Sequence, residues 1–77
     1  MTFRALDVVV LNTDLPKHGL RRGDLGTVVE TYEADGLEVE FVTALGRTTA
    51  LVSLTASAVR AVRDDDLVAV RPVSGAA

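Results

Sequence analysis

The chain has 77 residues, of which 48% are hydrophobic and 25% are charged, and its formal net charge is −3 at pH 7. This suits one small folded domain, because a disordered chain would be poorer in apolar residues. There is no cysteine, which excludes disulfides and cysteine-ligated metals, and the acidic balance disfavours a generic polyanion binder. No apolar run approaches the roughly 20 residues of a membrane span, and the first residues do not resemble a signal peptide, so we expect a cytoplasmic protein.

The first half of the chain predicts two strands joined by a long loop. Val and Thr are frequent, and their stiff β-branched side chains favour strands over helices. The apolar run DVVVL predicts a strand over residues 7–11, and LGTVVETY predicts another over residues 25–32. The intervening residues 12–24 are rich in turn formers, and we expect Leu15 and Leu20 to hold this loop to the body.

The third predicted strand has the clearest alternation in the chain. It covers residues 37–43 (LEVEFVT) and follows an Asp-Gly turn at residues 33–36, which is a strong hairpin signal. Apolar side chains alternate there with Glu38 and Glu40, so one face should be apolar and the other acidic.

The rest of the chain predicts shorter elements. We expect a turn at residues 44–46, a strand at 47–54, a one-turn 3-10 helix at 55–58 and a strand at 59–62. Residues 64–77 should lie outside the domain: an acidic turn, an edge strand that the pattern allows at 67–70, and a frayed tail from residue 72.

Together these elements predict an all-β fold, a small five-stranded SH3-like barrel over residues 1–63 with one short 3-10 turn before its last strand. Gly26 should mark a sharp bend into the second strand, while Gly36 and Gly46 should have positive φ. The predicted core consists of Leu25, Val28, Leu37, Val39, Phe41, Leu51 and Val59.

No motif in the chain predicts a catalytic, cofactor or metal site. His18 is the only histidine and sits among turn residues, where it is expected to be solvated. The consecutive acids 64–66 lack the interleaved spacing of a calcium loop, and no serine has a nucleophile-elbow context. We therefore expect a protein that is not an enzyme.

Two resemblances add expectations about function. The glycine spacing of residues 18–42, HGLRRGDLGTVVETYEADGLEVEFV, resembles KOW-type segments, which would imply contact with nucleic acid. A longer resemblance covers residues 5–62, through LDVVVL, DLPKHGLRRGDLGTVVE, VEFV, LVSL and VRAV. These runs resemble the bacterial family called domain of unknown function 4926. That resemblance implies a small SH3-like domain without enzymatic character, associated with gene pairs of toxin–antitoxin or immunity style.

The function we predict is a protein–protein interaction module, acting as an antitoxin-like or immunity-like partner of a neighbouring gene product. A basic loop precedes an acidic hairpin, and such a charge separation can orient a partner. The candidate partner-binding residues are Lys17, Arg21, Arg22, Glu38 and Glu40. A KOW-like nucleic-acid binder is the alternative, disfavoured by a single lysine and few aromatics. A homo-oligomer built through an exposed strand edge also remains open.

Overall fold

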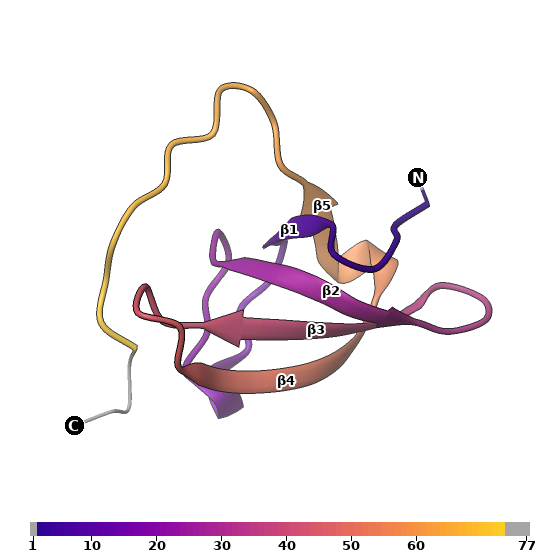
Figure 1. Cartoon of the computed structure of the whole chain (residues 1–77), viewed down its shortest axis with the longest axis horizontal. Helices are drawn as coiled ribbons and strands as arrows, with labels where there is room; N and C mark the ends of the chain where they lie inside the picture. The colour runs from indigo at the N-terminus through magenta and orange to yellow at the C-terminus, as the bar shows by residue number, and fades with distance from the viewer. Residues whose placement is uncertain (1, 74–77) are drawn as a thin grey trace.

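The computed structural model describes residues 2–73, which form five strands and two single-turn 3-10 helices (Figure 1). The elements in chain order are β1 (Val8–Leu11), η1 (Pro16–His18), β2 (Leu25–Thr31), β3 (Gly36–Val42), β4 (Thr48–Thr55), η2 (Ala56–Ala58) and β5 (Val59–Ala61). All five predicted strands and the 3-10 turn before the last of them are confirmed. Only η1 was not predicted, and it begins at Pro16, whose fixed φ suits a first helical position.

All five strands belong to one antiparallel sheet with the order β4-β3-β2-β1-β5. Successive strands from β1 to β4 are neighbours, whereas β5 returns from the far end of the chain to pair with β1, placing Ala61 opposite Val9. Within residues 2–73, β4 and β5 each have one strand neighbour, so the sheet has two edges and is not closed by a β4–β5 pairing. The strand order confirms an all-β domain.

One face of the curved sheet encloses the core. Of the predicted core, Val28, Leu37, Val39, Phe41 and Val59 are buried. The buried apolar residues that the prediction missed are Val9, Val10, Leu11 and Leu20. These come from β1 and the loop after it: Val9, Leu11 and Leu20 belong to the core cluster, and Val8 is the exposed residue of β1.

Two core predictions are wrong, and strand alternation explains one of them. Leu51 is 55% exposed because it pairs opposite Glu40 on the outer face, while Ala50, Val52 and Leu54 of the same strand pack against the core. Leu25, at the start of β2, is 39% exposed, and the inward position beside it belongs to Gly26.

Gly26 is required because of side-chain packing and not because of an unusual φ. A Cβ atom at this position would lie 2.6 Å from Val39 Cγ1 and 2.7 Å from Phe41 Cε1. Gly46 has the positive φ that was predicted, +96°. Gly36 does not, because Ala34 (φ 65°) takes the left-handed position in that turn.

Segments outside the strands are held to the sheet at specific points. Leu15 and Leu20 form an isolated bridge that closes the loop around η1, as predicted, and Leu20 is buried. After β5 the chain runs as an arc without regular structure to residue 73, so the edge strand allowed at 67–70 does not form (Figure 1). Of the tail predicted to fray, residues 74–77 lie outside the described part of the chain.

Candidate protein-interaction surfaces

The outer face of β2, β3 and β4 gathers three carboxylates. Glu38 and Glu40 alternate with buried residues along β3 and therefore share this face. The register of β2 shifts between Val28 and Glu30, which places Glu30 directly opposite Glu38. Without that irregularity Glu30 would occupy an inward position, so the shift puts a third acid on the outer face.

Two of these carboxylates accept hydrogen bonds from hydroxyl groups. Within residues 2–73 no cation forms an ion pair with any of the three. Ser53 Oγ donates to Glu38 Oε1 at 2.7 Å, and Thr48 Oγ1 donates to Glu40 Oε2 at 2.6 Å. Tyr32 Oη lies 3.5 Å from Glu38 Oε1. Partial desolvation, and then the nearby charges of Glu38 and Glu30, raise the pKa of the Tyr32 phenol above its ordinary 10.0.

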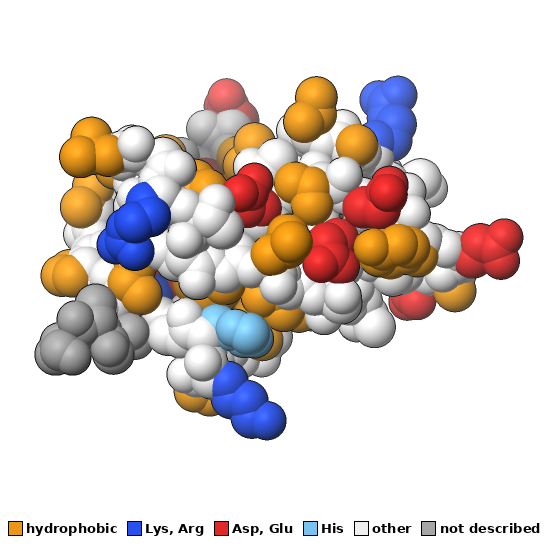
Figure 2. Space-filling model, turned by 60° about the horizontal axis from the view of Figure 1, so that its bottom comes forward, with side chains coloured by type: hydrophobic (Ala, Val, Ile, Leu, Met, Phe, Trp, Pro, Cys, Tyr) orange, Lys and Arg blue, Asp and Glu red, His pale blue; other side chains and the backbone are white. Residues whose placement is uncertain are grey.

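Exposed apolar side chains lie among these acids. Figure 2 shows acidic side chains, in red, interleaved with hydrophobic ones, in orange, across the middle of this face. The exposed large apolar residues of the three strands and the adjoining hairpin are Leu25, Val29, Tyr32, Val42 and Leu51. We call Glu30, Glu38 and Glu40 with Val29, Tyr32 and Leu51 the acidic–apolar face.

The predicted basic residues lie on a different element. Lys17 belongs to η1, and Arg21 and Arg22 lie further along the β1–β2 loop, all with exposed side chains. The loop is fixed through its backbone: the Arg21 N–H donates to Asp24 Oδ2 at 2.7 Å, and the Arg22 N–H donates to Asp14 Oδ1 at 2.8 Å. The structure therefore does not bring the basic and acidic candidates together on one strand, and the basic side chains make no hydrogen bond within residues 2–73.

Two arginine–aspartate pairs fasten the segment after β5. Arg60 binds Asp66 through two hydrogen bonds, Nη1 to Oδ2 at 2.9 Å and Nη2 to Oδ1 at 2.8 Å. These bonds, together with one from the Arg63 backbone N–H, hold the pKa of the Asp66 carboxyl well below its ordinary value. Arg71 reaches back to Asp24, with Nε donating to Oδ1 at 3.1 Å. The three acids 64–66 had been predicted to form a solvated linker; Asp66 is instead bound by Arg60, whereas Asp64 and Asp65 have exposed side chains.

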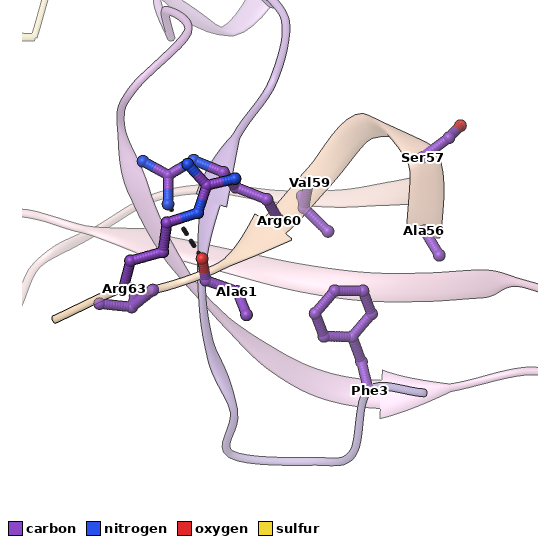
Figure 3. A pocket seen from close by; sticks show the side chains of 8 residues that line it. Phe3, Ala56, Ser57, Val59, Arg60, Ala61 and Arg63 are labelled. Atoms are coloured by element: carbon purple, nitrogen blue, oxygen red, sulfur yellow. Dashed lines mark hydrogen bonds between the residues drawn. The ribbon is translucent and has the colours of Figure 1, made fainter. Parts of the chain in front are cut away.

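A groove runs beside β5, which the sequence did not predict (Figure 3). Its volume is about 570 Å³, and the side chains that matter here are Phe3, Val59, Ala61, Val62 and Arg63. Phe3 comes from the segment before β1 and packs against the core. No local pattern could reveal this groove, because it is built from residues about sixty positions apart that meet only when β5 pairs with β1.

Among the described residues, no group of three or more His, Asp or Glu side chains could hold a metal ion. Nor does any helix in that part of the chain have the length and apolar character needed to cross a membrane.

The fold described above is that of a small all-β domain, and the sequence comparison gives its family. The family model described as Domain of unknown function (DUF4926) matches residues 5–61, which covers β1 to β5. The chain therefore belongs to this family, which confirms the resemblance seen in the sequence. No curated protein and no solved structure matches the chain.

Proposed function

We propose that this chain is a non-enzymatic protein-binding module of SH3-like barrel type, whose acidic–apolar face binds a basic, partly apolar surface of a partner protein. The strand order β4-β3-β2-β1-β5 and the 3-10 turn just before β5 support the SH3-like assignment. Neutralising a basic partner encoded nearby, in the manner of an antitoxin or immunity protein, is the form of this function that the family resemblance favours.

The observation that carries the proposal is the composition of the acidic–apolar face. Glu30 lies directly opposite Glu38, an arrangement of like charges that disfavours the sheet. No cation among residues 2–73 forms an ion pair with them, so a partner's Arg or Lys would find carboxylates that lack a counter-charge. Tyr32 and Leu51 beside them offer the apolar contact area on which affinity depends.

The exposed basic residues Lys17, Arg21 and Arg22 have a secondary role in this proposal. Together with the acidic face they give the surface a charge separation, which can orient a partner during encounter. A KOW-like nucleic-acid binder would use the same three residues on phosphates. The net charge of −3 and the acidic face oppose the approach of a polyanion, so we favour the protein partner.

Fluorescence anisotropy at low salt tests the proposal with three labelled probes: a basic amphipathic peptide, an acidic peptide of the same length and a short duplex DNA. We expect only the basic peptide to bind. The double variant Glu38→Gln/Glu40→Gln should weaken its binding by about 2- to 30-fold, since exposed ion pairs contribute about 0.2–1 kcal/mol each.

The matched control is Glu33→Gln/Asp35→Asn, which removes the same charge from exposed positions in the β2–β3 turn. This control should bind the peptide as the wild type does. Equal weakening in both double variants would mean that net charge, and not this face, attracts the peptide. Tighter binding of the DNA than of the basic peptide would instead favour the KOW-like alternative.

A further inference from the structure

The segment that follows β5, residues 66–71, is bound to the domain at its two ends, and the residues between those ends are exposed. Asp66 is bound by Arg60, and Arg71 is bound to Asp24, so both ends of residues 66–71 are tied to the domain. The segment lies outside residues 5–61, the part that defines the family. In Figure 1 it forms the wide arc that runs from β5 toward the C-terminus.

The residues between the two ties are apolar and exposed. Leu67 is 94% exposed, Val68 is 78% exposed and Val70 is 91% exposed. Their backbone groups make no hydrogen bond to the rest of the described chain, and they belong to no strand or helix. Residues 67–70 therefore combine β-favouring side chains with backbone N–H and C=O groups that have no partner in the described chain. These are the properties of a strand that is not yet paired with a sheet.

The open edge of β5 has the complementary properties. Among the described residues β5 pairs only with β1. On its other edge the Val59 N–H donates to Ala56 O, and Ala61 O accepts from Arg60 Nη1 at 2.9 Å, so an added strand would bond to the Val59 C=O and the Ala61 N–H. The groove beside this edge offers apolar contact from Phe3, Ala61 and Val62. Arg63 lies at the groove as well (Figure 3). Within residues 2–73 it donates a hydrogen bond through its backbone N–H, to Asp66, and none through its guanidinium group.

The charges of the segment and of the groove indicate what binds in the groove. The apolar residues 67–70 come directly after Asp64, Asp65 and Asp66, and the first two of these have exposed side chains. An extended segment of this composition can place apolar side chains in the groove while its carboxylates face Arg63. The groove and the segment that fits it are parts of the same chain, which is the self-complementarity that a two-fold interface requires.

We propose that this protein forms a two-fold symmetric dimer in which residues 64–70 of each copy add to the open edge of β5 in the other copy. The apolar residues of the segment lie in the partner's groove, and Asp64 and Asp65 face the partner's Arg63. This interface does not use the acidic–apolar face, so it goes beyond the proposed function, and either assignment can fail without the other.

Sedimentation velocity across a concentration series tests the dimer with the full chain. We expect the wild type to dimerise reversibly and Leu67→Asp/Val70→Asp to raise the dimer dissociation constant at least about tenfold, because two apolar side chains lose their contacts. Both positions are exposed in the monomer, so the circular dichroism spectrum and melting temperature at low concentration should not change. The matched control is Leu45→Asp, at a fully exposed leucine in the β3–β4 turn, which should dimerise as the wild type does.

A charge exchange tests the groove separately. Arg63→Glu should weaken the dimer, and combining it with Asp64→Arg/Asp65→Arg should restore it, since the pairing is then reversed in sign. A wild type that stays monomeric throughout the series overturns the proposal, as does a dimer that survives Leu67→Asp/Val70→Asp. A dimer that depends on residues 67–70 but is unaffected by Arg63→Glu overturns the assignment to the β5 groove.

Discussion

Replacing Gly26 by alanine should destabilise the domain through a single steric conflict. The added Cβ would lie 2.6 Å from Val39 Cγ1 and 2.7 Å from Phe41 Cε1, closer than nonbonded carbon atoms approach. Phe41 and Val39 are both buried among other core side chains, so neither can move without displacing its neighbours. Overpacking of this kind costs about 1–3 kcal/mol, a large share of the stability of a domain of this size.

Backbone strain does not add to the steric conflict at this position, so a loss of stability in Gly26→Ala can be assigned to packing. The φ of Gly26 is not in the left-handed region, so alanine adds no backbone strain and slightly restricts the unfolded chain. Gly36→Ala is the matched control, because its nearest contact would be Tyr32 Cβ at an ordinary 3.4 Å. We expect this control to change the free energy of unfolding by less than about 1 kcal/mol.

Urea denaturation followed by circular dichroism measures these differences as shifts in the midpoint at constant slope. The double variant Gly26→Ala/Phe41→Leu should be less destabilised than the sum of the two single variants, since the smaller side chain makes room for the new methyl group. If Gly26→Ala unfolds at the wild-type midpoint, or if the two substitutions are simply additive, the close approach of Phe41 is not what requires glycine.

Three further results are expected. Phe41→Ala should lower the free energy of unfolding by about 3–5 kcal/mol, as for other buried aromatics, and an unchanged melting temperature would contradict its place in the core. The pKa of Asp66 is lowered in the folded state by Arg60, so its stabilising contribution is present at neutral pH and lost as pH falls below about 4. Asp66→Asn should therefore reduce the neutral-pH melting temperature and flatten its decline in acid, and parallel pH profiles would count against the pairing. An absorbance titration should find the pKa of Tyr32 above 10.0 in the wild type and a lower value in Glu38→Gln. Equal pKa values in the wild type and the variant would show that Glu38 does not raise the pKa of Tyr32.

The strands could be predicted from sequence because their signals are local. The alternation in residues 37–43 predicted which side chains of β3 face the core. Runs of β-branched residues bounded by turn residues predicted where the other strands lie. Glu38 and Glu40 were predicted on a common outer face for the same reason. The prediction for Leu51 failed because residues 50–52 are three consecutive apolar residues, which obscures the alternation; the apolar set Ala50, Val52 and Leu54 faces inward, and Leu51 shares the outer set with Ser53.

The features that were missed depend on contacts between distant residues. Arg71 and Asp24 are separated by 47 positions, and no local spacing predicts that they meet. The position of Glu30 on the outer face depends on a register shift in β2, and no feature of the β2 sequence predicts that shift. Phe3 and Val62 line one groove only because β5 pairs with β1, and no local sequence pattern indicates that pairing.

The place of β5 beside β1 has a consequence for how the protein is made. Three of the four strand pairings join consecutive strands, across two short turns and the longer β1–β2 loop, but the fourth joins Val9 to Ala61 and raises the contact order. During synthesis β1 emerges first, and one of its edges, in a strand of four apolar residues, stays uncovered until β5 has left the ribosome. The nascent chain therefore carries an aggregation-prone edge throughout its elongation, and completion of the sheet is a late step of its folding.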